Sequence, residues 1–385
     1  MLPKSFQLKI SSHRQILNTI RLRGEISGAE LARKNNLQPS TLVYILRSLR
    51  ERGLIEISRV GAQLGSVGKP PTLWRLTPGM GYIVGLEIIS NEARATIVDF
   101  GGDVVHQEHK LGLENVGPAK LPHSIMSFYD ELMTHLHIDL EKIIGVGVAL
   151  TGLVDRERGL VHYSRKLQLQ DFPIEDELRK FLQKPVEAVN DANAGALGIK
   201  WHDGNVAAER KNAIFLTLNE KTAYFGAGLI LNGNLYEGAQ GAAGEIFTSL
   251  PSLGELIQLG ADKYGEDQPL LRSGKKKNEL GIEEVIQTAR QQCPISKDVL
   301  IHYTKFVVNE IVRIVSLLNP ELIVLGGDIS DAQDLIQEEV LKGVQDRLQQ
   351  IFPGGLTCPE IQFSKFGIYS VSVGATALIM RKIFQ

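Results

Sequence analysis

A short β-branched segment that runs directly into a helix is the feature that most constrains the fold of this chain. The pattern predicts a strand from Val186 to Val189, followed at once by Asn190 and Asp191 and by a helix from Ala192 to Lys200. Open α/β sheets bind ligands at the carboxyl ends of their strands. The segment therefore predicts an α/β body with polar groups at a strand end.

Asn190 and Asp191 allow two interpretations. An amide both donates and accepts hydrogen bonds and an ionised carboxylate accepts them, which suits a polyhydroxylated ligand. Asn and Asp are also favoured residues for capping the first turn of a helix. Spacing alone favours neither, so ligand binding and helix capping both stay open.

The distribution of charge separates the first 77 residues from the rest. The chain has 385 residues, which is too long for one compact domain. Residues 1–77 contain 13 of the 42 Lys and Arg but only 4 of the 44 Asp and Glu, so they carry +9 and the remainder carries −11. A basic segment joined to an acidic body indicates that the segment binds a polyanion.

Composition excludes two other classes of protein. No apolar run reaches membrane-spanning length, and the first residues do not resemble a signal peptide. The two cysteines, Cys293 and Cys358, lack metal-binding spacing and fit a reducing compartment. We expect a cytoplasmic protein with no membrane segment, no metal site and no cofactor.

Residues 1–77 show the pattern of a winged helix-turn-helix. Apolar residues recur at helical spacing in three segments, with Gly24 as a stop, Ser27 and Glu30 in capping-box positions and Pro39 at a first turn. Two β-rich segments joined by a glycine-punctuated turn follow. We expect helices at His13–Arg23, after Ser27 and from Pro39 to about Arg52, and strands at Leu54–Ser58 and Thr72–Leu76.

The third of these helices has a polar face opposite its apolar one. Short hydroxyls and an Arg there suit base edges and phosphates in a major groove, and basic residues on the wing suit the backbone or the minor groove. A solvated surface helix would show the same polarity, but the order of elements together with the +9 charge favours binding to double-stranded DNA. The predicted DNA-binding residues are Gln38, Ser40, Thr41, Tyr44, Arg47, Arg59 and Lys69.

Residues 78–385 contain two sets of strands and helices, which predicts two α/β lobes. The first lobe is expected to comprise about residues 78–190 and the C-terminal helix, and the second about residues 191–370. The expected strands are Tyr82–Ile89, Ala93–Asp99, Val104–Glu108, Ile143–Leu150, Asn212–Leu218, Gly226–Leu231 and Leu322–Leu325, and the longest expected helices are Leu121–His137 and Val299–Leu318.

Five stretches also match known motifs. They are Leu31 to Ile55, Gly145 to Asp155, Pro185 to Asn193, Gly233 to Ile246 and Asn319 to Gly327. Together they resemble the ROK family: its head, its glycine-and-aspartate strand, its sugar and catalytic motif, its second sugar loop and its adenosine-side motif. The resemblance implies a winged helix-turn-helix joined to a two-lobed body of the actin and hexokinase type.

The same resemblance implies a function. Proteins of this kind are transcriptional regulators, and we expect a repressor of carbohydrate genes that binds a pseudo-palindromic operator as a homodimer or homotetramer. The resemblance assigns ligand binding to Asn190, Asp191, Glu245 and Gly152, which would line one pocket and sense a sugar. Lys166 stands where the family often has an Asn that faces the sugar, and it could instead pair with Asp191.

Three departures from the family pattern concern catalysis. Family kinases carry Asp-x-Gly-Gly-Thr on the first strand to hold phosphate, and here Glu87 to Asn91 take that place. The second phosphate loop is bulky at Thr222 to Gly226, and Phe247 and Thr248 replace the Gly-His that precedes a cysteine-rich zinc loop. Asp191 would match a general base with no cradled phosphate to act on, so we predict no phosphoryl transfer.

Two alternatives remain at this point. The chain could be an active sugar kinase with an accessory head, or a regulator whose body binds a partner protein and no sugar. ATP-dependent phosphorylation of hexoses would identify the first, and sugar-independent capture of a partner would identify the second.

Overall fold

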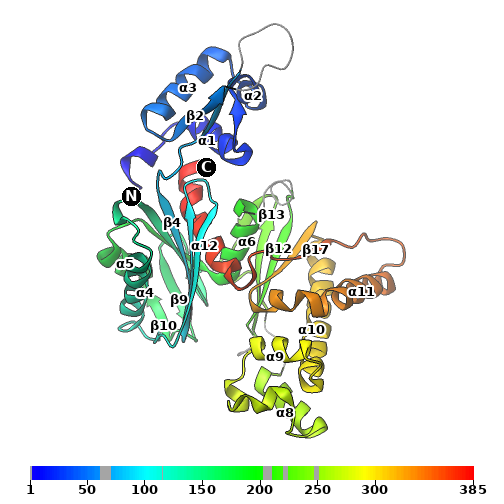
Figure 1. Cartoon of the computed structure of the whole chain (residues 1–385). Helices are drawn as coiled ribbons and strands as arrows, with labels where there is room; N and C mark the ends of the chain where they lie inside the picture. Colours follow the sequence, from blue (N-terminus) through cyan, green and yellow to red (C-terminus); the bar gives the residue numbers. More distant parts are fainter. Residues whose placement is uncertain (1, 61–70, 115, 203–209, 220–223, 247–250) are drawn as a thin grey trace. The chain divides into compact units, whose positions relative to one another are not determined.

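The computed structural model describes residues 2–60, 71–114, 116–202, 210–219, 224–246 and 251–385. The chain divides into two compact units (Figure 1). Unit 1 comprises residues 1–190 and 372–385, and unit 2 comprises residues 191–371. The chain passes from the first unit to the second between Asn190 and Asp191 and returns between Val371 and Ser372.

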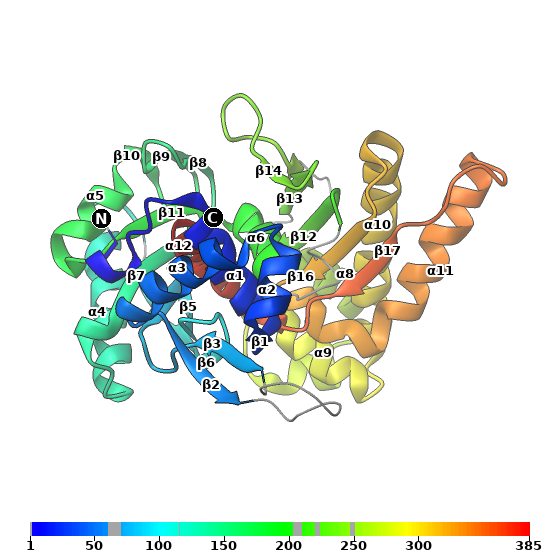
Figure 2. The same ribbon diagram turned by 90° about the horizontal axis from the view of Figure 1, so that it is seen from above.

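The first part of unit 1 has the predicted winged-helix order. Figure 2 shows α1, α2 and α3 bundled together. Gly24, with a φ of 69°, ends α1, the Ser27 hydroxyl accepts the Glu30 N–H at 3.2 Å, and Pro39 opens α3. The elements are α1 (Ser11–Arg23), β1 (Ile26–Ser27), α2 (Gly28–Lys34), α3 (Pro39–Glu51), β2 (Ile55–Val60) and β3 (Thr72–Leu76).

The short strand β1 was not predicted. It pairs antiparallel with β3, with Ile26 opposite Trp74, and β3 pairs in turn with β2. Two residues carry no detectable strand periodicity, so only the pairing with a segment nearly fifty residues away defines this strand.

The rest of unit 1 is built on a five-stranded sheet of order β11-β7-β4-β5-β6. Strands β4, β7 and β11 are parallel, and β5 and β6 add antiparallel strands at one edge. The sheet consists of β4 (Tyr82–Ile89), β5 (Glu92–Asp99), β6 (Val104–Leu111), β7 (Ile143–Leu150) and β11 (Val186–Asn190). Helices α4 (Leu121–His135) and α5 (Ile174–Leu182) and a small sheet of β8 (Leu153–Asp155), β9 (Leu160–Ser164) and β10 (Leu169–Phe172) complete it.

Two glycines let the C-terminal helix α12 (Ser370–Phe384) lie close against this sheet. A Cβ on Gly85 of β4 would lie 2.0 Å from the Ser372 carbonyl oxygen, and one on Gly147 of β7 would lie 1.9 Å from that of Ala375. Any side chain at these positions would displace the helix backbone. The final helix of the chain is therefore part of the first lobe.

Aromatic residues join the N-terminal segment to this lobe. The Phe6 ring lies 5.2 Å from the Phe100 ring, which stacks at 5.4 Å on Phe384, the last residue of α12. The guanidinium of Arg21, on α1, lies 5.4 Å from the centre of the Phe384 ring. Burial lowers the pKa of Arg21 to about 10, and Asp103 acts in the opposite direction. Arg21 remains charged at neutral pH, so a cation–π contact holds α1 to α12.

Unit 2 has a sheet of order β14-β13-β12-β16-β17, with β15 paired to β13. Figure 1 shows its two longest helices, α10 and α11, side by side. The strands are β12 (Ala213–Asn219), β13 (Tyr224–Leu231), β14 (Asn234–Tyr236), β15 (Glu245–Ile246), β16 (Leu322–Gly326) and β17 (Glu360–Phe363). The helices are α6 (Asp191–His202), α8 (Leu253–Tyr264), α9 (Ile282–Arg290), α10 (Pro294–Leu318) and α11 (Gln333–Ile351).

Most predicted elements of the body occur within a few residues of the expected bounds. The largest difference is α10, which begins at Pro294 and not at Val299 because Pro294 occupies a favourable first-turn position after Cys293. No helix in the described part of the chain is long and apolar enough to cross a membrane.

Candidate functional site

The polar face of α3 is the first candidate site. Leu42, Ile45, Leu46 and Leu49 are buried on one side of the helix. The predicted DNA-binding residues of this helix lie on the other side and are exposed: Ser40, Thr41, Tyr44 and Arg47, with Gln38 exposed at the N-cap. The α3 backbone thus presents two hydroxyls, a phenol and a guanidinium together on one surface.

One of these side chains rests on a buried histidine. Tyr44 is 64% exposed, and its ring meets the His13 ring edge-on with 6.1 Å between centroids. His13 is 5% exposed, and burial, followed by the positive charge of Arg52, lowers the pKa of its imidazole. A neutral imidazole on α1 therefore supports the phenol ring from below while its outer face stays in solvent.

The structure describes the two predicted wing residues to different extents. Arg59 lies on β2, where its backbone pairs opposite Leu73 of β3. The Arg59 side chain and all of Lys69 lie outside the described part of the structure. Their DNA contacts stay predictions.

The second candidate site begins at the carboxyl ends of β7 and β11 in unit 1. Asn190, the last residue of β11, pairs with Leu150, the last residue of β7. The buried Asn190 amide donates to the Gly152 carbonyl at 3.0 Å. Gly152 has a φ of 115°, and a Cβ there would lie 2.4 Å from the Tyr163 carbonyl oxygen, so only glycine fits. The structure thus brings together two of the predicted ligand-binding residues, Asn190 and Gly152.

A buried carboxylate supports the strand that carries Asn190. Glu175 of α5 accepts the Ala188 N–H of β11 at 2.8 Å and forms an ion pair with Arg179. Burial raises the pKa of Glu175, whereas the Ala188 bond and the Arg179 charge lower it. These bonds fix β11 laterally, two residues before Asn190.

The other two predicted ligand-binding residues, Asp191 and Glu245, belong to unit 2. Glu245 is exposed on β15 and pairs with Gly226 of β13. A Cβ on Gly226 would lie 3.0 Å from the Ala192 Cβ, next to Asp191 in the chain. This packing places the two carboxylate-bearing residues in one region of unit 2.

Asp191 also has a local role. It is the first residue of α6, and its side chain accepts the Ala192 N–H at 2.8 Å. That bond is compatible with the capping interpretation and does not by itself exclude ligand binding. Both interpretations of Asp191 therefore stay open.

The carboxyl end of β4 carries a buried ion network. The Arg94 guanidinium lies 3.6 Å from Glu87 and 3.5 Å from Glu92, and the His109 imidazole lies 2.9 Å from Glu92. Arg94, Glu87 and Glu92 are 4%, 6% and 8% exposed. Ile89, which stands where family kinases carry a glycine, is buried beside this network.

Part of the proposed loss of the phosphate and zinc motifs rests on residues that are not described. Thr222, Ala223, Phe247 and Thr248 all lie outside the described ranges. Within those ranges, no group of three or more His, Cys, Asp or Glu side chains is arranged to hold a metal ion.

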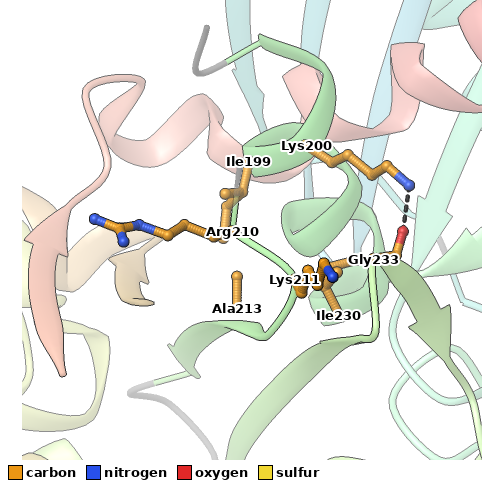
Figure 3. Close-up of a pocket in the computed structure, with 7 residues that line it drawn as sticks. All are labelled: Ile199, Lys200, Arg210, Lys211, Ala213, Ile230 and Gly233. Carbon is orange, nitrogen blue, oxygen red and sulfur yellow. Dashed lines mark hydrogen bonds between the residues drawn. The ribbon is translucent and has the colours of Figure 1, made fainter. Parts of the chain in front are cut away.

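Unit 2 also contains a cavity of about 140 Å³ (Figure 3). None of the four predicted ligand-binding residues lines it. In Figure 3 the Lys200 amine turns toward the Gly233 carbonyl, to which it donates, and Arg210 extends away from both. Arg210 pairs with Glu360 at 2.9 Å. The Lys200 and Arg210 cations therefore point in different directions and do not converge on one anion. The lining of the cavity comprises Ile199, Lys200, Arg210, Lys211, Ala213, Ile230 and Gly233.

Comparison with known families accounts for the combination of a winged helix and a two-unit body. The ROK family profile matches residues 83–248 and 263–382, most of the chain. The chain belongs to the ROK family. A profile described as a winged helix DNA-binding domain matches residues 11–70 in front of the ROK region.

Relatives within the ROK family include both regulators and kinases. The xylose repressor of Caldicellulosiruptor bescii is 23% identical over 390 residues, covering 95% of this chain and 94% of the relative. The glucokinase of Halalkalibacterium halodurans is 25% identical over 282 residues, covering 67% of this chain and 84% of that enzyme. A crystal structure of a ROK family transcriptional regulator, a homologue of the Escherichia coli MLC protein, superimposes with a TM-score of 0.74 at 19% identity, covering 97% of this chain and 96% of that one.

Two residues at these sites were not singled out from the sequence: Arg94 and His109. The Arg94 pair had a detectable signal, because a two-residue turn at Ser90 and Asn91 places Glu87 directly opposite Arg94. His109 lies opposite Arg94 on the next strand of the same antiparallel sheet, so it joins the network through the β5–β6 pairing.

Proposed function

We propose that this ROK family protein is a DNA-binding transcriptional regulator, a repressor of carbohydrate genes that responds to a sugar without phosphorylating it. The observation that carries the proposal is the exposed face of α3, where Ser40, Thr41, Tyr44 and Arg47 lie above a fully apolar buried face. The +9 charge of residues 1–77 supports the same conclusion. The name of the xylose repressor supports regulation in response to a sugar.

DNA recognition is tested with the full chain. A binding sequence selected from random DNA is titrated with the parent and with a variant carrying Thr41→Ala, Tyr44→Ala and Arg47→Ala together. We expect sequence-specific binding to be lost in the variant and binding by the parent to weaken steeply with salt. Arg272→Ala removes one exposed positive charge in unit 2 and is the matched control. Equal binding by parent and triple variant would refute the α3 assignment.

The operator is proposed to be pseudo-palindromic and bound by a homodimer. A two-fold protein symmetry would place one α3 in each of two major-groove half-sites. Light scattering of the free protein and of its complex with the selected DNA measures the stoichiometry. One chain per operator would contradict this part of the proposal.

Sugar binding is proposed for four polar positions: Asn190 and Gly152 in unit 1, and Asp191 and Glu245 in unit 2. These groups combine amide, carboxylate and backbone positions, which suit a ligand whose hydroxyls both donate and accept. A sugar changes DNA affinity only if it binds two states of the protein with different affinity. The sugar-response proposal therefore requires both binding and coupling.

Thermal stabilisation across a carbohydrate library identifies the sugar. Asp191→Asn then keeps an oxygen for the Ala192 N–H and removes only the charge. We expect this variant to bind the operator as the parent does but to lose the sugar response. An unchanged response would exclude Asp191 from the ligand site, and a collapse of DNA binding without sugar would establish its structural role.

The absence of phosphoryl transfer is proposed from the end of β4. Glu87 and Glu92 surround Arg94 where a kinase would need a phosphate-binding turn. A coupled assay for ADP over a panel of hexoses should show no sugar-dependent turnover, with an active glucokinase as positive control. Sugar-dependent ADP formation would favour the alternative of an active kinase.

A further inference from the structure

Thr151 carries a buried hydroxyl group that the fold does not use. The residue follows β7 directly and is 9% exposed. Its hydroxyl oxygen is buried and has no hydrogen-bond partner within the described residues. Buried polar atoms in folded proteins nearly always have a partner, so the Thr151 hydroxyl requires an explanation.

Packing alone does not explain a threonine here. Valine has nearly the same shape, also favours an extended backbone and carries no polar group that burial would leave unsatisfied. In the ligand-free protein the hydroxyl is therefore a net cost to stability. A residue that costs stability where an apolar isostere would fit is characteristic of a functional position.

The hydroxyl is held in a rigid and well-defined place. Leu150 at the end of β7 pairs with Ile88 of β4 on one side and with Asn190 of β11 on the other. The carbonyl of Gly152, two residues after Leu150, accepts a hydrogen bond from the Asn190 amide at 3.0 Å. Thr151 is thus fixed between the end of a strand and a tied carbonyl, at the edge where open α/β sheets bind their ligands.

We propose that the Thr151 hydroxyl is a direct hydrogen-bonding contact for one hydroxyl of a neutral sugar. The inference rests on the proposed sugar response and adds a specificity-determining residue to it. A threonine hydroxyl can donate one hydrogen bond and accept others, and carries no charge. It therefore matches an alcohol group, which also donates and accepts.

Two matched variants test the contact in the full-length protein. Thr151→Val removes the hydroxyl and keeps the shape, whereas Thr151→Ser keeps the hydroxyl and removes the methyl group. The sugar that stabilises the parent most in the carbohydrate library is the probe, together with its singly deoxygenated analogues. Calorimetry measures the Kd of each pair, and urea denaturation measures the stability of each ligand-free variant.

The expected pattern has three parts. Thr151→Val is as stable as the parent or more stable without ligand, and binds the sugar about 5- to 100-fold more weakly. Thr151→Ser binds with a Kd close to that of the parent. One deoxygenated analogue loses affinity for the parent but loses much less for Thr151→Val, because both changes remove the same hydrogen bond.

Each other outcome overturns the contact. An unchanged Kd for Thr151→Val, or equal losses for the valine and serine variants, would show that the hydroxyl makes no bond to the ligand. A loss in Thr151→Val that every deoxygenated analogue shares would indicate a bridging water or a shape effect. If no sugar binds the parent, the proposed sugar response fails and this inference fails with it. If the parent binds a sugar but the variants give one of the three contradicting results above, only the inference about Thr151 is overturned.

Discussion

The proposed DNA-binding surface of α3 and the strand ends of unit 1 use polar side chains in opposite ways. On α3 the polar groups are exposed, and Arg47 and Thr41 extend into solvent above a buried apolar stripe. At the strand ends the polar groups are buried, and Glu87 and Glu92 form ion pairs with Arg94. Water serves as the partner in the first region, and the fold must supply the partner in the second.

This difference separates the consequences of mutation in the two regions. Removing an exposed group that water solvates affects the external ligand and leaves the fold nearly unchanged. Removing one member of a buried set leaves the others unsatisfied, so stability falls. Thr151 belongs to neither group, because its hydroxyl is buried but has no hydrogen-bond partner within the described residues. Its removal should therefore weaken ligand binding without lowering the stability of the fold.

The largest expected effect is on stability, from Arg94→Met. The change removes the guanidinium from two buried carboxylates, Glu87 and Glu92, and should lower the free energy of unfolding by about 3–5 kcal/mol. Urea denaturation followed by circular dichroism measures the loss. Adding Glu87→Gln should restore part of it, and a loss below about 1 kcal/mol would mean that the network is not a buried one.

Arg47→Ala should show the reverse pattern. We expect specific DNA binding to weaken by about 1–3 kcal/mol if the guanidinium contacts a base edge, and the free energy of unfolding to change by less than about 0.5 kcal/mol. Fluorescence anisotropy with the selected sequence and with random DNA separates two contact types. An equal loss on both would assign Arg47 to a phosphate.

Asn190→Ala tests whether a single buried bond at the strand end contributes to stability. The variant leaves the Gly152 carbonyl without the amide that it accepts at 3.0 Å, so we expect a loss of about 1–2 kcal/mol in urea denaturation. Asn234→Ala is the matched control, because that amide donates to a carbonyl in an exposed turn. Similar losses for the two variants would contradict the distinction between buried and exposed polar groups.

The smallest expected effect is a pH dependence of stability at His13, beneath the proposed DNA-binding surface. Because burial lowers the pKa of His13, the unfolded chain binds a proton more readily than the folded one. His13 therefore reduces stability as the pH falls through about 6.5, the value for an unperturbed histidine, and the reduction levels off below its folded pKa. His13→Phe keeps a ring beneath Tyr44 and should show less of this decline. Parallel curves for parent and variant would contradict it.

Much of the N-terminal winged helix could be predicted because its signals are local. Gly24, Ser27 and Pro39 mark helix ends through their own backbone and capping properties, and the apolar spacing from Leu42 to Leu49 identifies the buried face of α3. The exposed face follows as its complement, so the exposed polar residues of this helix could be predicted from the sequence. The same holds for the strand that ends at Asn190, whose β-branched residues precede a helix without any loop.

Other features depended on the tertiary structure. Gly85 and Gly147 had no local signal, and their need for a bare backbone appears only where α12, more than two hundred residues later, lies against the sheet. The sequence placed Thr151 within a recognisable motif, but whether a hydroxyl has a partner depends on every segment packed around it. Burial and hydrogen-bond satisfaction are properties of such surroundings, and for this chain only the folded arrangement decided them.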